Sequence, residues 1–102
     1  MALSKKESDS RVNILMGEVY VNQGWLYPAI GAFRAAGEEI PKAKLVKCGE
    51  TCLDQGLLDD AFAAFKAAGD KAKLVKCAEA YIAQGRSNLA YKAFEAAVSL
   101  EE

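Results

Sequence analysis

The sequence contains no histidine, only two prolines and no excess of charge of either sign. Histidine is the commonest general base and metal ligand near neutral pH, so its absence leaves cysteine and carboxylates as the groups that could support catalysis. Thirteen basic and fourteen acidic residues give a net charge of −1, too little positive charge for a phosphate-binding surface. We therefore expect neither an enzyme nor a nucleic-acid partner.

The chain also lacks an apolar run of the length that spans a membrane, about 18 residues or more. Residues 1–10 have no apolar stretch of the kind found in a secretory signal. Three cysteines make an odd count, and they lie in helix-like segments rather than in a small disulfide framework. These absences predict a cytoplasmic protein with reduced thiols and no membrane partner.

The residues that are present favour an ordered, helical chain. Hydrophobic residues make up 52% of the sequence and charged residues 26%, a composition that excludes a largely disordered protein. A chain of 102 residues has room for one domain. We expect this domain over residues 10–102, with residues 1–9 as a flexible leader.

Internal repetition is the main signal in the chain. The segment KAKLVKC begins at Lys42 and returns unchanged at Lys71, and a Gln-Gly pair ends a helical segment at Gly24, Gly56 and Gly85. A period in this range is typical of arrays in which one helical hairpin stacks on copies of itself. The repetition therefore predicts an all-α solenoid of three hairpins.

Six helices follow from the apolar periodicity and from the residues that begin and end helices. Asp9 or Ser10 is suited to cap the first helix, Asp70 the fifth, and Ser87 or Asn88 the sixth. The expected helices cover about residues 11–23, 28–36, 42–55, 58–68, 71–84 and 88–100. They form three antiparallel helix-turn-helix repeats at about residues 10–41, 42–70 and 71–102.

The three units share small and aromatic residues at matching places. These are Gly17, Tyr20, Gly24, Ala29, Phe33 and Ala36; Gly49, Cys52, Gly56, Ala61, Phe65 and Ala68; and Ala78, Tyr81, Gly85, Ala90, Phe94 and Ala97. The pattern resembles the tetratricopeptide (TPR) repeat, in units shorter than that family's length of about 34 residues. The resemblance implies a right-handed α–α superhelix whose first helices line a concave ligand groove.

Close packing within each hairpin is expected at the small residues. Gly17 and Gly49 would let the two helices of a hairpin approach each other. Phe33, Phe65 and Phe94 would then fill the space beside them at intervals of one repeat. We expect all three phenylalanine rings to be buried.

A stripe of apolar residues brackets a glutamate on each first helix. The candidate groove residues are Ile14, Glu18, Val21 and Asn22; Val46, Lys47, Glu50, Leu53 and Asp54; and Val75, Lys76, Glu79 and Ile82. Such a face suits an amphipathic helix or an extended peptide with apolar and basic side chains. We therefore expect a non-catalytic scaffold or adaptor that binds a peptide or helix of a partner protein.

Two alternatives apply to this stripe. The apolar residues can simply pack the first helices together. Lys47 and Lys76 stand three residues before Glu50 and Glu79, a spacing of ordinary surface ion pairs. In that case the charges form a solvated face and recognise no ligand.

The cysteines offer a weak alternative chemistry. Cys48 and Cys52 lie four residues apart on one expected helix, which could supply half of a zinc site, but Cys77 lies one repeat away. Free cysteine packs as a small hydrophobic residue. We expect buried thiols, no metal and no cofactor.

The open ends of the array suggest a different function. Arrays of this kind need polar terminal repeats, and no further helix is expected after Leu100. The last hairpin would then expose Leu89, Tyr91, Val98 or Leu100 on its outer side. Val98 stands where the other units have glycine, so the last helix is expected to continue. The alternative function is a self-associating module that forms a homo-oligomer through its ends or its groove.

Overall fold

The computed structural model describes residues 5–100, with side chains from residue 9 onward. In that range the chain is all-helical and contains no strand. Its helices are α1 (Lys5–Gln23), α2 (Leu26–Ala35), α3 (Lys42–Asp54), α4 (Leu58–Ala68), α5 (Lys71–Ala83) and α6 (Ser87–Ser99). The predicted all-α class and the six helices are therefore confirmed for the described residues.

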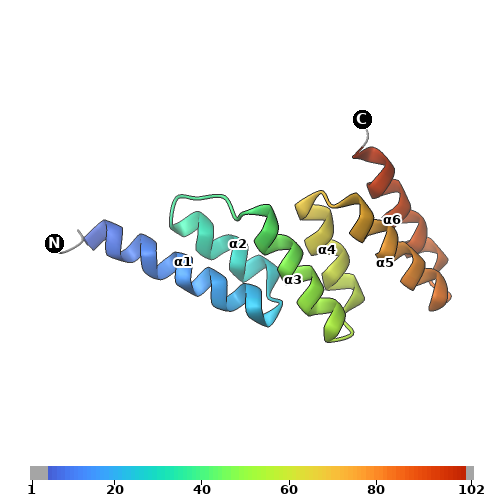
Figure 1. Ribbon diagram of the computed structural model, residues 1–102, viewed down its shortest axis with the longest axis horizontal. Helices are drawn as coiled ribbons and strands as arrows, with labels where there is room; N and C mark the ends of the chain where they lie inside the picture. The colour runs from blue at the N-terminus through green and yellow to red at the C-terminus, as the bar shows by residue number, and fades with distance from the viewer. Residues whose placement is uncertain (1–4, 101–102) are drawn as a thin grey trace.

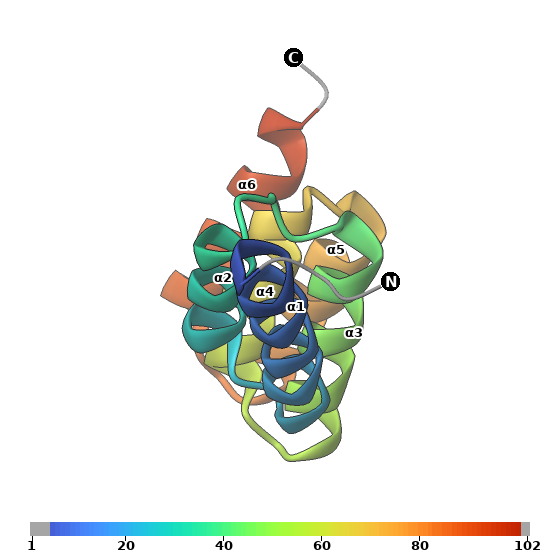
Figure 2. The same cartoon turned by 90° about the vertical axis from the view of Figure 1, so that its left-hand side faces the viewer.

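Consecutive helices pack in pairs, α1 with α2, α3 with α4 and α5 with α6. Each pair is an antiparallel hairpin, and the three hairpins follow one another along the longest axis (Figure 1). The molecule measures 56 × 31 × 16 Å. Seen from the N-terminal side, the hairpins lie one behind another, and α6 extends past the outline of the others (Figure 2).

The junction between α4 and α5 illustrates how the sequence sets helix ends. Gly69 follows α4 with a φ angle of 66°, in the left-handed region that glycine adopts without steric cost. The next residue, Asp70, accepts a hydrogen bond at 3.1 Å from the backbone N–H of Lys73 and so caps α5. The predicted cap at Asp70 is confirmed.

The first helix begins earlier than predicted. It starts at Lys5, so residues 5–9 of the expected leader are helical, while residues 1–4 lie outside the described range. Residues 5–10 contain neither proline nor glycine, and lysine and glutamate are good helix formers. The polar composition of this segment marked it as a leader, although nothing in it stops a helix.

Two other helix starts differ from the prediction. Leu26 precedes the expected second helix of about residues 28–36, but it is the first residue of α2, and its side chain is buried. Arg86 occupies the N-cap position of α6, and no side chain there caps the helix, so the expected caps Ser87 and Asn88 are wrong. The expected extension past Val98 is confirmed, because α6 continues to Ser99.

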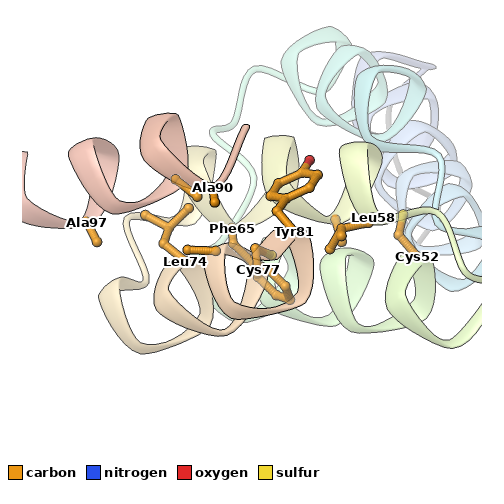
Figure 3. Packing of buried hydrophobic residues seen from close by; sticks show 11 residues of the cluster. Cys52, Leu58, Phe65, Leu74, Cys77, Tyr81, Ala90 and Ala97 are labelled. Atoms are coloured by element: carbon orange, nitrogen blue, oxygen red, sulfur yellow. The ribbon is translucent and has the colours of Figure 1, made fainter. Parts of the chain in front are cut away.

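Two hydrophobic cores lie along the chain, and each spans a boundary between consecutive hairpins. The first core contains Val21, Leu26, Ala29, Leu45, Cys48, Ala64 and Ala68. The second core contains Cys52, Leu58, Ala61, Phe65, Leu74, Cys77, Ala78, Tyr81, Ala90, Ala93 and Ala97. Figure 3 shows residues of the second core on helices of both the second and the third hairpin. Hydrophobic burial therefore joins the hairpins to one another as well as closing each hairpin.

The phenylalanine positions confirm the predicted packing in two hairpins and contradict it in the third. Phe33 and Phe65 are 2% and 0% exposed, but Phe94 is 37% exposed. A Cβ atom at Gly17 would lie 2.6 Å from the Phe33 ring, and one at Gly49 would lie 2.5 Å from the Phe65 ring. The third hairpin has an alanine at that position, and no described hairpin lies beyond α6. The expectation that all three rings are buried is therefore wrong for Phe94.

Candidate functional site

The predicted groove residues lie on α1, α3 and α5, and one of them is inside the protein. Val21 is 1% exposed and belongs to the first core, so its assignment to a partner-binding groove is wrong. Its spacing from Ile14 places both residues on one side of α1. That side meets α3, whose Leu45 and Cys48 share the first core with Val21.

The other apolar groove residues are covered to different extents. Ile14, Val46, Leu53 and Val75 are half-buried, whereas Ile82 is 56% exposed. Val46 packs against both cores, and Leu53 and Val75 pack against the second. The stripe therefore contributes to packing between helices, and its largest exposed apolar side chain is that of Ile82.

Two of the three glutamates in the row are paired with a lysine of the next hairpin. Lys44 Nζ lies 3.5 Å from Glu18, and Lys73 Nζ lies 3.5 Å from Glu50. The two lysines occupy matching places in the repeat. These pairs cross hairpin boundaries instead of joining residues three apart on one helix. Because they are solvent-exposed, each contributes only about 0–1 kcal/mol.

Several charged groups of the predicted groove stay accessible to a partner. Lys47, Lys76 and Glu79 are exposed, and none forms an ion pair with another described residue. Asn22 and Asp54 are also exposed, near the ends of α1 and α3. The surface thus presents both basic and acidic side chains beside partly exposed apolar ones.

The first helices do not form one continuous surface. α1 packs directly against α3, whereas α3 and α5 do not pack on each other. α5 packs against α4 instead. Figure 1 shows α4 between α3 and α5 at this boundary. The predicted groove is therefore divided into a part formed by α1 and α3 and a part formed by α5.

Open cavities lie between the second helices of the hairpins, where the sequence pattern did not predict a site. The larger one, about 560 Å³, lies between α4 and α6 and is lined by Phe62, Lys66, Leu74, Lys92, Glu95, Ala96, Ser99 and Leu100. A second, of about 270 Å³, is lined by Ile30, Arg34, Glu39, Ile40, Leu45 and Ala67. One feature of the sequence could have indicated the larger cavity. Val98 stands where the other two units have the glycine that follows the second helix, so α6 is longer and brings Leu100, which lines the cavity, beside Gly69.

The cysteine thiols are placed for packing. Cys48, Cys52 and Cys77 are all buried, and Cys52 Sγ donates a hydrogen bond at 3.1 Å to the carbonyl oxygen of Gly24. Burial raises the pKa of Cys48 to about 12 and that of Cys77 to about 11. The thiolate is the form that attacks substrates or binds metals, so these groups stay unreactive near neutral pH.

A polar cluster ties α4 to the third hairpin. Tyr81 Oη donates a hydrogen bond at 2.7 Å to Asp59, and Arg86 lies 3.2 Å from the other carboxylate oxygen. The hydrogen bonds from Tyr81 and then Arg86 lower the pKa of Asp59. Burial, followed by the contact with Asp59, raises the pKa of Tyr81. This cluster fixes the position of α5 on α4.

Function has to be inferred from this geometry. No family model, curated protein or solved structure matches this chain. In the described range, no helix is both long and apolar enough to cross a membrane. No group of three or more cysteine, aspartate or glutamate side chains within residues 5–100 is arranged to hold a metal ion.

Proposed function

We propose that this chain is a non-catalytic protein-interaction scaffold of the tetratricopeptide-like kind, which binds a peptide or helix of a partner protein. The binding surface has two parts, one formed by α3 with a contribution from α1 and the other formed by α5. The observation that carries the proposal is the combination of exposed Ile82 and half-buried Leu53 with accessible charges at Lys47, Glu50 and Glu79. Mixed surfaces of this type bind amphipathic segments.

The repeated sequence and the linear order of the three hairpins support a solenoid, and the resemblance to the tetratricopeptide repeat implies that its twist is right-handed. Each hairpin contacts only its neighbours in the row, as expected for a repeat array. Binding of a peptide or helix in this way needs neither a cofactor nor a metal. Buried, protonated thiols favour a reducing compartment such as the cytoplasm.

The partner segment should carry basic side chains between apolar ones. Glu50, Asp54 and Glu79 are exposed on this surface, and Glu79 has no ion-pair partner among the described residues. Acidic groups of this kind set the choice of partner and the association rate more than the affinity. The apolar contacts at Ile82 and Leu53 would supply most of the affinity.

Selection of peptides displayed on phage tests this proposal. Peptides that alternate basic and apolar residues should be enriched on the wild-type chain and should bind Glu50→Lys/Glu79→Lys at least tenfold more weakly. That loss corresponds to about 1.4 kcal/mol. The matched control is Glu38→Lys/Glu95→Lys, which changes the net charge equally at exposed positions outside the surface. The proposal fails if both variants bind the selected peptides equally well.

A further inference from the structure

Exposed apolar side chains gather at the C-terminal end of the array. Three sets of matching positions, in chain order, are Ile30, Phe62 and Tyr91; Phe33, Phe65 and Phe94; and Val21, Leu53 and Ile82. In each set the first two residues are buried or half-buried and the third is exposed. A neighbouring hairpin thus covers these positions where the structure describes one. We call Ile82, Tyr91, Phe94 and Val98 the C-terminal end face.

A second apolar face lies at the opposite end. Val12, Leu15, Met16 and Val19 are exposed on α1, and their spacing places them on one side of the helix. Met16 is 42% exposed, whereas the matching residues Cys48 and Cys77 are at most 1% exposed. Those cysteines lie in cores that span hairpin boundaries. We call the four α1 residues the N-terminal end face.

The boundary between the second and third hairpins shows how two such faces fit together. The Phe62 ring lies 6.2 Å from the Tyr81 ring, and Phe65 shares the second core with Leu74 and Cys77. Phe62 and Phe65 match Tyr91 and Phe94 of the C-terminal end face. Cys77 matches Met16 of the N-terminal end face. Leu74 and Tyr81 match Asn13 and Tyr20, which are half-buried on α1 beside that face. The internal contact therefore recurs at the two ends of the chain in part, through Tyr91 and Phe94 at one end and Met16 at the other.

We infer that the chain binds a second copy of itself head to tail, with the C-terminal end face of one copy packed on the N-terminal end face of the next. The occupant is a second copy because only the internal boundary supplies a template for both surfaces. Since the two faces differ, the contact is heterologous, and each added copy leaves one of each face open. The assembly grows as an open chain and does not stop at a symmetric dimer.

Charges at the two ends are compatible with this contact. Glu18 and Glu50 each pair with a lysine of the following hairpin, and Glu79 occupies the matching place in the third. The position that corresponds to those lysines in the first hairpin is Val12, and the basic Arg11 is adjacent to it. Ile82 and Glu79 belong both to this contact and to the proposed partner-binding surface. The two proposals can still fail separately, because the substitutions that block the end faces leave Ile82, Glu50 and Glu79 unchanged.

Sedimentation velocity tests the inference with the 102-residue chain. The weight-average mass of the wild type should rise continuously from micromolar to millimolar concentration. Tyr91→Glu/Val98→Glu blocks the C-terminal end face, and Val12→Glu/Val19→Glu blocks the N-terminal end face. Each blocked variant alone should remain a monomer, because it retains only one type of face. An equal mixture of the two should form a 1:1 dimer and nothing larger.

Two controls make the result decisive. Tyr27→Glu/Ala35→Glu adds the same charge at exposed positions of α2 and should associate like the wild type. If circular dichroism shows that a blocked variant has lost helix, the experiment is repeated with serine instead of glutamate at the same positions. A wild type that stays monomeric at millimolar concentration overturns the inference. So does a blocked variant that dimerises alone, since this would require contact between two identical faces.

Discussion

The two boundaries between consecutive hairpins are built differently, although they join copies of one repeat. At the first boundary α3 packs directly on α1. Cys52 of α3 and Gln55, the residue that follows α3, donate hydrogen bonds to the carbonyl oxygens of Gly24 and Gln23, respectively. At the second boundary α5 packs on α4 and not on α3. Side-chain links there include the cluster around Tyr81 and the Lys73–Glu50 ion pair.

One repeated position accounts for the difference. It is occupied by Cys52 in the second hairpin and by Tyr81 in the third. The small Cys52 lets the end of α1 approach closely, since a Cβ atom on Gly24 would lie 3.1 Å from its sulfur atom. The larger Tyr81 is also buried, and its hydroxyl group is held by Asp59 of α4. Its ring lies 6.2 Å from that of Phe62, and its hydrogen bond to Asp59 holds α5 on α4. We attribute the separation of α5 from α3 to the larger volume of this side chain.

The comparison shows that an identical sequence can pack against different neighbours. Both α3 and α5 begin with the segment KAKLVKC. Against the preceding hairpin, however, α3 packs mainly on the first helix, α1, whereas α5 packs on the second helix, α4. The neighbours of this segment are therefore decided by residues outside it. Function that depends on the surface of the first helices depends on the same residues.

Removal of a large and fully buried side chain of the second core is expected to have the strongest effect on the comparison. Phe65→Ala should lower the free energy of unfolding by about 3–5 kcal/mol, because the ring is fully buried and leaves a cavity. Phe94→Ala, at the matching but partly exposed position, should cost less than half as much. Urea denaturation measures both. Equal losses would show that the second boundary does not depend on burial of Phe65.

A tyrosine at the first boundary should disrupt it. Cys52→Tyr introduces at the first boundary the residue type that Tyr81 supplies at the second. Cys52 is fully buried and lies next to Gly24. Overpacking of this kind costs about 1–3 kcal/mol. The midpoint of urea denaturation should fall accordingly. An unchanged midpoint would mean that the first boundary has room for a phenol ring, and that residue size does not separate the two arrangements.

Loss of a single hydroxyl group should weaken the second boundary selectively. Tyr81→Phe removes the hydrogen bond to Asp59 while the ring stays in the core, and should cost about 0.5–1.5 kcal/mol. Tyr91→Phe is the matched control, because this side chain is exposed on α6. Thermal denaturation at neutral pH should separate the two variants. If they melt together, the hydroxyl group does not hold α5 on α4.

The smallest expected effect concerns acid stability. The pKa of Asp59 is lowered in the folded chain, so its contribution is present above the pKa of the unfolded chain, about 3.9. That contribution is lost as the pH falls through the lower, folded value. Asp59→Asn should therefore lose less unfolding free energy than the wild type on acidification below about pH 4. The difference should shrink in a Tyr81→Phe background. If the unfolding free energy of the wild type and of every variant falls equally with pH, the effect does not come from Asp59.

The sequence predicted the helices well and their neighbours poorly. Glycine and Asp70 mark helix ends through local geometry, so the hairpins follow from a local pattern. Spacing also placed Val21 and Ile82 on one side of their helices. It could not predict that the first is buried and the second exposed, because that depends on which hairpin lies beside each. The same reason explains the exposure of Phe94.

A pair of distances between spin labels tests most directly whether the two boundaries differ. Asn22, Asp54 and Ala83 occupy matching, exposed positions near the ends of α1, α3 and α5. Labels carried on unnatural amino acids leave the buried cysteines intact, and pulsed electron paramagnetic resonance measures each distance. We predict that the distance from Asn22 to Asp54 is shorter than that from Asp54 to Ala83. Equal distances, or a shorter second distance, would contradict the proposed difference between the boundaries.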